Sequence, residues 1–292
     1  MRTALVTGAT GFTGKYMVNA LARLGYRVFG IGVGSPSTED WVTCDLTHKA
    51  DAKHAIRGIA TDVVVHLAGL AFVAENNPED FYRVNLLGTL NLLEALAECK
   101  RTPRKVVIAS SANIYGSSAA ELTEDTCPAP TNHYAASKCA MELMAKLWFD
   151  RMPIVITRPF NYTGPGQDEK FVIPKIVAHY RRRERSIKLG NTSVQRDFSD
   201  VEEVVEAYLR LLESDVRSEV VNICSGKAVS IASILGEMNT IAGYKMQVEA
   251  DPALFRENDI KVLVGSNRKL FDLTGFVPSR PIQETVRRMY FA

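Results

Sequence analysis

The feature that most constrains this chain is a glycine-rich turn near its start, between residues 4 and 14. The apolar run Ala4 to Val6 predicts a buried strand, and the amphipathic segment Lys15 to Leu24 predicts a helix. Between them, Gly8 permits a tight turn, Gly11 lets the backbone approach a pyrophosphate, and Gly14 lets helix and strand pack closely. The free N–H groups at the helix start would face the phosphates. We therefore expect a dinucleotide-binding unit, with a plain strand–turn–helix as the alternative.

Strand and helix signals alternate through the first half of the chain. We predict further strands at Arg27 to Ile31, Asp62 to Leu67, Lys105 to Ser110 and Ile154 to Thr157, and helices at Phe81 to Cys99 and Tyr134 to Asp150. Such repeated units indicate an α/β fold of the Rossmann type, a doubly wound parallel sheet with helices on both faces. After residue 159 the rhythm changes to turns and shorter segments. We expect a dinucleotide-binding domain at 1–159, with a return at about 197–224, and a smaller C-terminal α/β substrate-binding part at 160–196 and 225–292.

Composition excludes several classes of protein. The formal charge of +2 on 292 residues is too balanced to suggest nucleic acid as a partner. The longest apolar run, Val63 to Ala74, is interrupted by His66 and is too short to span a bilayer, so we expect no membrane partner. The chain leads straight into a strand, and we expect no signal peptide. Its five cysteines are scattered without metal-ligand spacing, which favours free thiols, no metal site and a cytoplasmic protein.

A tyrosine and a lysine at helical spacing are candidates for acid–base chemistry. Tyr134 and Lys138 stand four residues apart, so a helix would place them on one face. An ammonium group beside a phenol lowers the pKa of the tyrosine from about 10, and the lysine together with a cationic nicotinamide ring would let it exchange a proton with a sugar oxygen near neutral pH. Such a pair is commonly accidental. However, Ser111 follows a predicted strand whose carboxyl end should face the same crevice. The three elements together predict a catalytic site beside the dinucleotide.

With these segments the chain resembles, over nearly its whole length, the extended short-chain dehydrogenase/reductase family, in the branch that acts on nucleotide sugars. The resemblance rests on the segments Gly8 to Gly14, Asp45-Leu46, His66 to Gly69, Ser110 to Gly116 and Tyr134 to Lys138, and on Asn85. It implies that Tyr134 is the general acid/base, that Lys138 holds the nicotinamide ribose and that Ser111 bonds the substrate oxygen. The implied cofactor-binding residues are Gly8, Thr10, Gly11, Phe12, Thr13, Gly14, Asp45, Leu46, Leu67, Ala68, Gly69, Asn85, Ser110, Tyr134, Lys138 and Arg158.

The second half of the chain resembles the substrate side of this family. The segments Arg158 to Asn161 and Gly164 to Gln167 resemble its substrate loop, and Phe171 to Ile173 resembles the stretch along the nucleotide base. The implied substrate-binding residues are Ser111, Asn113, Asn161, Phe171, Val172, Arg196 and Arg256, the two arginines for a diphosphate. Glu257 departs from the family pattern, which has proline there. The tail from 251 to 278 is most similar to GDP-4-keto-6-deoxy-D-mannose reductases and also resembles GDP-mannose 4,6-dehydratases.

The cofactor preference is predicted from the end of the second strand. NAD-binding proteins carry an acid there for the ribose hydroxyls, and Gly32 provides none. No arginine for a 2′-phosphate is nearby, but Ser35, Ser37 and Thr38 could act as neutral donors. We therefore expect NADP, with NADPH preferred and NADH possible.

The reaction is predicted from the segment after Ser111. Dehydratases of this family carry a carboxylate where this chain has Asn113, and an amide cannot shuttle a proton at neutral pH. The resemblance therefore implies NAD(P)H-dependent reduction of the 4-keto group of a GDP-4-keto-6-deoxyhexose, giving a GDP-6-deoxyhexose of the GDP-rhamnose or GDP-6-deoxytalose type. A nucleotide-sugar 4-epimerase or dehydratase of the same fold is the enzymatic alternative, and an NADP-binding regulator is the non-enzymatic one.

The resemblance also implies a homodimer. In this family, the helices that match Phe81 to Cys99 and Tyr134 to Asp150 form a four-helix interface between two subunits. The alternative is that each apolar helix face packs only on its own sheet.

Overall fold

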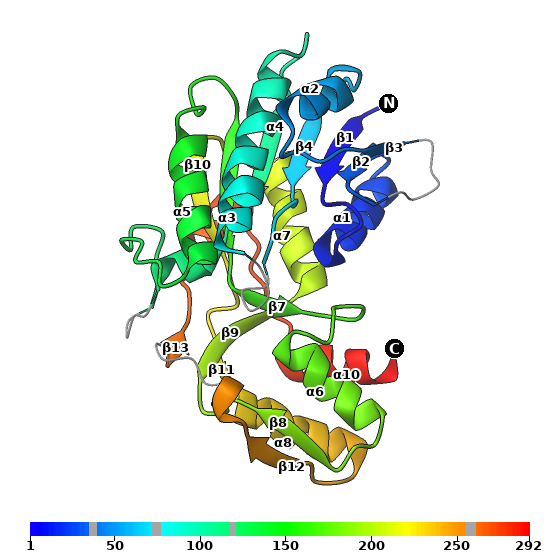
Figure 1. Cartoon of the computed structure of the whole chain (residues 1–292), viewed down its shortest axis with the longest axis vertical. Coiled ribbons are helices and arrows are strands. Elements are labelled where there is room, and N and C mark those ends of the chain that lie inside the picture. The colour runs from blue at the N-terminus through cyan, green and yellow to red at the C-terminus, as the bar shows by residue number, and fades with distance from the viewer. Residues whose placement is uncertain (35–39, 72–76, 117–120, 255–260) are drawn as a thin grey trace.

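A seven-stranded parallel sheet forms the larger part of the molecule, drawn in the upper half of Figure 1. The computed structural model describes residues 1–34, 40–71, 77–116, 121–254 and 261–292. The strand order is β10-β6-β5-β4-β1-β2-β3, and every neighbouring pair is parallel. The strands are β1 (Thr3–Thr7), β2 (Arg27–Gly32), β3 (Trp41–Thr43), β4 (Val63–His66), β5 (Lys105–Ala109), β6 (Ile154–Pro159) and β10 (Glu219–Ile223). The predicted Rossmann-type doubly wound sheet is thereby confirmed.

Alternate residues of the sheet strands enter two separate cores. In β4, Val63 and Val65 pack against one set of helices, whereas Val64 packs against the other. Both faces are covered, which explains why the central strands are apolar at nearly every position. The first set of helices is α1 (Phe12–Arg23), α7 (Val201–Glu213) and α9 (Arg268–Thr274), and the second is α2 (Lys49–Arg57), α4 (Gly88–Ala97) and α5 (His133–Lys146).

The long helix predicted from Phe81 to Cys99 is interrupted. Helix α3 (Pro78–Phe81) leads into a wide π-helical turn at Tyr82–Leu87, and α4 follows from Gly88. Within the wide turn, Asn85 is fully buried, and its backbone carbonyl accepts a hydrogen bond from the Thr89 hydroxyl at 2.7 Å. Turns of this kind often lie at functional sites. The spacing of apolar residues could not reveal this interruption, because apolar residues recur at helical spacing both before and after the wide turn.

A smaller part follows the larger sheet and lies below it in Figure 1. Its core is formed by α6 (Val172–Arg181), α8 (Ile231–Ala242) and α10 (Ile282–Phe291), together with strand β8 (Ser186–Leu189), which pairs with β12 (Gln247–Ala250). Strand β9 (Gln195–Asp200) joins β7 (Asn161–Thr163), β11 (Ala228–Ser230) and β13 (Val262–Leu263) in a four-stranded sheet. Helix α7 packs against β5, and β10 extends the large sheet beside β6. The chain therefore returns to the large sheet between Val201 and Ile223.

The order of the strands places the functional region. The chain moves outward from β1 to β2 and β3, and then returns to the other side of β1 with β4, β5 and β6. The strand order thus reverses between β1 and β4, and ligands of doubly wound sheets bind at the carboxyl ends of the strands beside such a reversal. In this chain, Thr7 and His66 end those two strands.

Candidate active site

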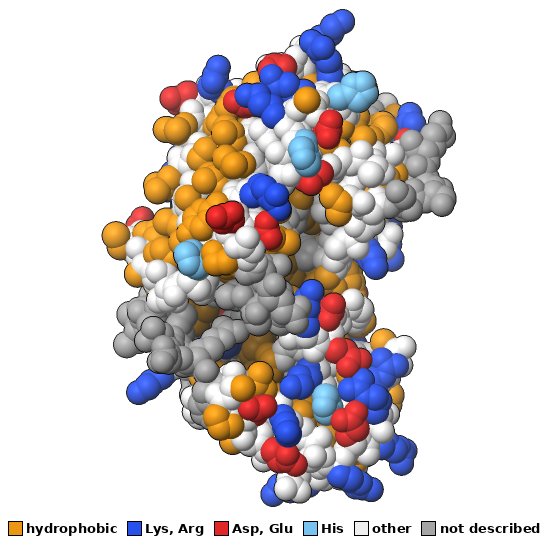
Figure 2. Space-filling model, in the orientation of Figure 1, with side chains coloured by type: hydrophobic (Ala, Val, Ile, Leu, Met, Phe, Trp, Pro, Cys, Tyr) orange, Lys and Arg blue, Asp and Glu red, His pale blue; other side chains and the backbone are white. Residues whose placement is uncertain are grey.

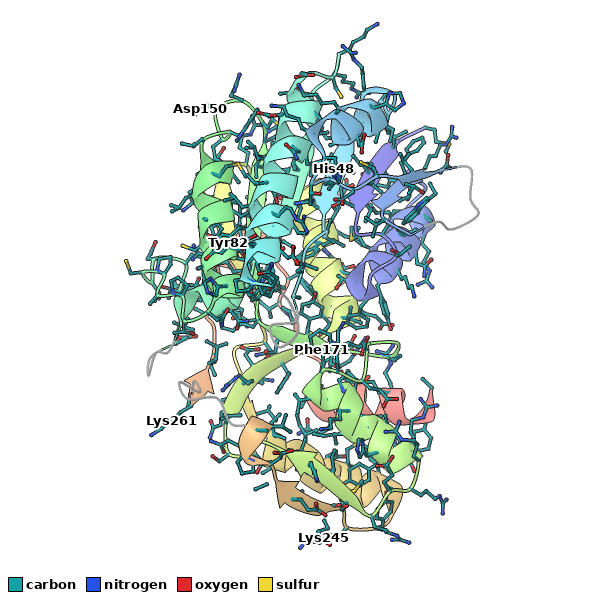
Figure 3. All side chains as sticks on the ribbon, viewed as in Figure 1. His48, Tyr82, Asp150, Phe171, Lys245 and Lys261 are labelled. Atoms are coloured by element: carbon teal, nitrogen blue, oxygen red, sulfur yellow. The ribbon has the colours of Figure 1, made fainter. Side chains whose placement is uncertain are left out.

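A cavity of about 620 Å³ lies at the carboxyl ends of β1, β4, β5 and β6, between the large sheet and α6. Its size is typical of pockets for small-molecule ligands and cofactors. Figure 2 shows the molecular surface hollowed at the junction of the two parts, and Figure 3 places Phe171 at this junction, at the start of α6. The cavity is lined by most of the predicted site residues, namely Gly8, Gly11, Phe12, Thr13, Gly14, Leu67, Gly69, Ser110, Ser111, Asn113, Tyr134, Lys138, Asn161, Phe171 and Val172.

The glycine turn has the shape that a dinucleotide requires. A Cβ atom on Gly14 would lie 2.1 Å from the carbonyl oxygen of Gly8, so only glycine lets α1 start this close to β1. Gly8 has φ +67°, and a Cβ there would lie 2.8 Å from the backbone nitrogen of Ala68. Gly11 is the N-cap of α1 and has no side chain to accept hydrogen bonds from the first N–H groups of the helix. Gly11, Phe12, Thr13 and Gly14 line the cavity, and the first N–H groups of a helix have no intrahelical partner, so the residues present fit the pyrophosphate of a nicotinamide dinucleotide.

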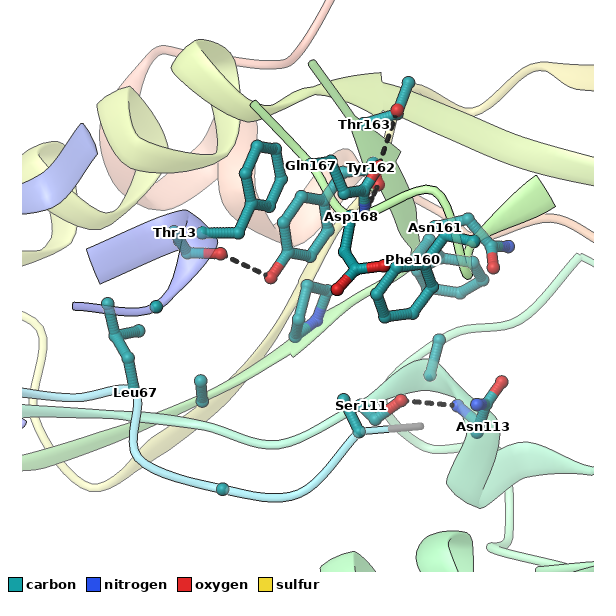
Figure 4. Close-up of a pocket in the computed structure, with 18 of the residues that line it drawn as sticks. Thr13, Leu67, Ser111, Asn113, Phe160, Asn161, Tyr162, Thr163, Gln167 and Asp168 are labelled. Atoms are coloured by element: carbon teal, nitrogen blue, oxygen red, sulfur yellow. Dashed lines mark hydrogen bonds between the residues drawn. The ribbon is translucent and has the colours of Figure 1, made fainter. Parts of the chain in front are cut away.

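Three side chains with proton-transfer chemistry meet in the cavity. Tyr134 lies in the first turn of α5, whose N-cap Asn132 accepts a hydrogen bond from the Ala135 backbone at 2.8 Å. Ser111 follows β5, and its hydroxyl accepts a hydrogen bond from the Asn113 backbone at 3.2 Å, as Figure 4 shows. Lys138 stands one helical turn after Tyr134, and its ammonium group donates a hydrogen bond to the carbonyl of Ala109 at 2.8 Å.

Lys138 by itself does not lower the pKa of Tyr134, whereas the sequence predicted this effect for the lysine together with a cationic nicotinamide ring. Burial raises the pKa of Tyr134 to about 12, opposed only in part by a hydrogen bond with Ser111. Lys138 is not among the causes of this shift, and its ammonium group is bonded to Ala109. Burial lowers the pKa of Lys138 itself to about 8, although the nearby Glu142 raises it. Tyr134 is therefore a protonated phenol at neutral pH, which can donate a proton.

Asn85 stands behind the cavity and fixes the backbone that forms its wall. Its side-chain oxygen accepts a hydrogen bond from the Leu70 backbone at 2.9 Å, and its amide donates to the Ser137 hydroxyl at 3.0 Å. A Cβ on Gly69 would lie 2.9 Å from the Asn85 Oδ1 atom and 3.3 Å from the Lys138 Nζ atom. Asn85 thus joins the loop after β4 to helix α5 and does not itself line the cavity.

A buried histidine supports the same wall. The Thr89 hydroxyl donates to the Asn85 carbonyl, so it accepts from Nε2 of His66 at 2.8 Å. Nδ1 is then an acceptor, and the Thr7 hydroxyl donates to it at 2.6 Å. Burial and the nearby Lys138 lower the pKa of His66 to about 3, so the ring is neutral. His66 therefore links the ends of β1 and β4 to the wide turn.

Two buried polar atoms in the cavity are available to a ligand. The Ser110 hydroxyl and the Asn161 amide nitrogen are buried and have no hydrogen-bond partner within the described parts of the chain. Both residues line the cavity. Because unpaired buried polar groups are costly, their presence here indicates that a bound molecule supplies their partners.

Several predicted contacts lie outside the cavity. Arg158 has a different role from the one expected, because its guanidinium is buried in an ion pair with Glu142 at 2.7 Å and also donates to the Tyr115 hydroxyl at 2.8 Å. Arg196 is half-buried on β9 and is not among the lining residues, and Arg256 lies outside the described residues, as do Ser35, Ser37 and Thr38. The cavity lining also does not include Thr10, Asp45, Leu46 and Ala68.

The structure brings further side chains into the cavity that were not among the predicted site residues. Tyr162 stacks on Phe12 with ring centroids 6.2 Å apart, and its hydroxyl bonds the Thr13 hydroxyl at 2.8 Å (Figure 4). The substrate side therefore contacts the glycine turn directly. Asp168 and Lys170 also line the cavity, and Asp168 is the one carboxylate among its described lining residues. The turn Gly164 to Gln167 was recognised from the sequence, but which neighbouring side chains face inward depends on its fold.

The site and fold together define a class of protein. A doubly wound sheet with a glycine turn at its switch point, and with serine, tyrosine and lysine at the ends of neighbouring elements, is that of a short-chain dehydrogenase/reductase. More narrowly, the chain belongs to the GDP-mannose 4,6 dehydratase family, whose sequence model matches residues 5–289.

Individual relatives span nearly the whole chain. The chain is 34% identical to GDP-6-deoxy-D-talose 4-dehydrogenase of Aggregatibacter actinomycetemcomitans, over 93% of this chain and 90% of that protein. It is 32% identical to GDP-6-deoxy-D-mannose reductase of Pseudomonas aeruginosa, over 97% and 94%.

Two solved structures share the fold closely. The structure of RMD from Pseudomonas aeruginosa complexed with NADPH superposes with a TM-score of 0.89 at 31% identity, covering 100% of this chain and 98% of that one. A provisionally assigned epimerase from Burkholderia cenocepacia J2315 superposes with a TM-score of 0.93 at 46% identity, covering 99% and 97%.

Proposed function

We propose that this protein reduces the 4-keto group of a GDP-4-keto-6-deoxyhexose to a hydroxyl, with NADPH as the preferred donor and NADH as a possible one. The observation that carries the proposal is the placement of the Tyr134 phenol and the Ser111 hydroxyl in one cavity with the glycine turn. Reduction of a carbonyl needs one hydride at carbon and one proton at oxygen. The two relatives above are named for chemistry on a GDP-6-deoxyhexose, and a structural neighbour is complexed with NADPH.

Each residue has a defined part in this proposal. When bound, a reduced nicotinamide supplies a hydride to the carbonyl carbon. Tyr134 gives its phenolic proton to the carbonyl oxygen, and Ser111 donates a hydrogen bond that orients this oxygen. Lys138, which is cationic below about pH 8, holds the nicotinamide ribose, as the family resemblance implies. The unpaired amide of Asn161 donates to the substrate from the opposite wall.

Dehydration is the competing reaction, because the family is named for it. It would need a further acid or base at C5 and C6, and the segment after Ser111 offers the amide of Asn113. Asp168 lies on the other side of the cavity, where its carboxylate accepts a hydrogen bond from the Lys170 backbone at 2.9 Å. An Asp168→Asn variant distinguishes the two reactions, because a reductase does not require this carboxylate for proton transfer.

Two incubations test the proposal. GDP-4-keto-6-deoxymannose with NADPH should consume the NADPH and give a 4-hydroxy sugar, whereas GDP-mannose with NADP⁺ should give no keto-sugar. Asp168→Asn should retain the first reaction with kcat within about tenfold, since it lacks a proton-transfer role. Keto-sugar in the second incubation, lost in Asp168→Asn, would favour the dehydratase. Silence in the first would favour another nucleotide sugar or the non-enzymatic regulator.

A homodimer through α4 and α5 is part of the same proposal. Three leucines at these helices are exposed: Leu87 directly before α4 at 48%, Leu143 on α5 at 62% and Leu147 directly after α5 at 79%. Figure 2 shows hydrophobic side chains gathered over this side of the molecule. Such a cluster of exposed leucines favours a face that a second subunit covers over the alternative that each helix packs only on its own sheet. The double variant Leu143→Glu/Leu147→Glu should convert the dimer to a monomer in light scattering. Phe271→Glu, at another exposed apolar residue, should leave the dimer intact. A wild type that is monomeric at micromolar concentration would contradict the dimer.

The proposed setting is the cytoplasm. The five cysteines are all free thiols, which supports a reducing compartment. In the described ranges, no helix has the length and apolar character needed to cross a membrane.

A further inference from the structure

The carboxyl end of β2 is covered by an indole ring. Strand β3 pairs with β2 so that Trp41 stands opposite Gly30. A Cβ on Gly30 would lie 2.5 Å from the Trp41 Cε3 atom, and a Cβ on Gly32 would lie 3.1 Å from Cζ2 and 3.4 Å from Cη2. The ring is held in place because its Nε1 donates to the carbonyl of Gly34 at 2.7 Å. Trp41 therefore fills the space beside both glycines.

This ring stands next to the glycine turn of the cavity. The Cβ position on Gly32 is 3.6 Å from the Thr10 hydroxyl, and that on Gly30 is 3.2 Å from the Ala9 side chain. The backbone of Gly8 also donates to the carbonyl of Ile31 at 2.8 Å, which ties the turn to the end of β2. In doubly wound sheets this strand end faces the adenosine ribose, and a carboxylate here binds the ribose hydroxyls of NAD. Such a carboxylate repels the 2′-phosphate of NADP.

We propose that Trp41 is a specificity-determining residue for the cofactor, because its six-membered ring lies only 3.1 Å from the Cβ that any carboxylate side chain at position 32 would need. The ribose end of the site then carries no acid from β2 that opposes a 2′-phosphate. Asp40, the neighbouring acid on this edge, is held by Arg27 in hydrogen bonds of 2.6 and 2.9 Å. The inference rests on the proposed function only in that it requires a nicotinamide dinucleotide in the cavity.

The test is a double-variant cycle read by direct binding. NADPH and NADH are titrated without substrate into wild type, Gly32→Asp, Trp41→Val and the double variant, using calorimetry, and each protein is also melted. Wild type should bind NADPH more tightly than NADH. Gly32→Asp alone should weaken the binding of both cofactors and lower the melting temperature, because the new side chain meets the Trp41 ring. The ratio of the NADPH and NADH affinities should change less than about threefold. The double variant should shift the preference toward NADH by at least about tenfold and melt higher than Gly32→Asp.

Controls separate packing from charge. Gly32→Ala adds only a Cβ, so it should weaken the binding of both cofactors equally, and adding Trp41→Val should restore that binding. These two variants replace Gly32→Asp and its double variant if Gly32→Asp does not fold. Trp148→Phe removes the protein's other tryptophan and should leave the binding of both cofactors unchanged. A full tenfold shift in Gly32→Asp alone, with nothing added by Trp41→Val, would overturn the inference, as would Gly32→Ala binding like wild type. Correct binding ratios without turnover of the keto-sugar would instead refute the proposed function and leave this inference standing.

Discussion

Replacing Tyr134 by phenylalanine removes one oxygen from the centre of the proposed site. The tyrosine is 7% exposed, and its ring packs edge-on against Phe81 with centroids 6.0 Å apart. Phenylalanine keeps this contact. The variant loses only the phenolic oxygen, whose hydrogen bonding is worth about 1 kcal/mol, so the melting temperature should fall by only about 2–4 °C.

The effect on the rate should be much larger than the effect on stability. Removing a positioned proton donor costs about two to four orders of magnitude, which corresponds to about 3–5 kcal/mol of barrier. Single-turnover oxidation of NADPH by GDP-4-keto-6-deoxymannose measures this loss directly. The binding of NADPH and of GDP, measured by calorimetry, should stay within about threefold of wild type, since the cavity keeps its shape.

A matched control removes a buried phenolic oxygen elsewhere. Tyr180 is fully buried in the smaller part, where its hydroxyl donates to Asn239 at 2.7 Å. Tyr180→Phe should lower the melting temperature as much as Tyr134→Phe and leave kcat unchanged. If Tyr134→Phe reduced the keto-sugar at a rate within threefold of wild type, Tyr134 would not be the proton donor, and the proposed mechanism would fail.

Three further predictions concern the surroundings of this tyrosine. Lys138→Met should weaken NADPH binding. In the free protein burial lowers the pKa of Lys138 to about 8, below its value of about 10.4 in the unfolded chain, so the unfolding free energy of wild type relative to this variant should rise between those two pH values. A difference in unfolding free energy that stays constant with pH in urea titrations would contradict this prediction. Arg158→Met leaves the Glu142 carboxylate buried without its partner and should lower the free energy of unfolding in urea by about 3–5 kcal/mol. The double variant Glu142→Leu/Arg158→Met should recover most of this loss, and an equally unstable double variant would refute the ion-pair argument. Gly14→Ala, whose Cβ would lie 2.1 Å from the Gly8 carbonyl, should lower the NADPH affinity by at least about tenfold in calorimetry, and unchanged affinity would mean that the turn can open freely.

The sequence by itself determined the order of the elements and the backbone of the site. Val63 to Val65 had to form a central strand because all three residues are apolar, and the glycines of the turn occupy positions where the structure leaves almost no space for a Cβ. Tyr134 and Lys138 were also predictable, since their spacing on one helix fixes their common face. These features are local: each depends on residues close together in the chain.

Only the tertiary structure decided which groups each side chain meets. Arg158 precedes the substrate loop in sequence, yet Glu142 on a neighbouring helix binds it, because an arginine buried at the end of β6 requires a carboxylate partner. The pKa of Tyr134 is governed by burial in the assembled cavity and not by the lysine four residues away. Trp41 covers Gly32 from the adjacent strand. Helical spacing and composition carry no information about such contacts, because they form between segments that meet only when the sheet and its helices are packed together.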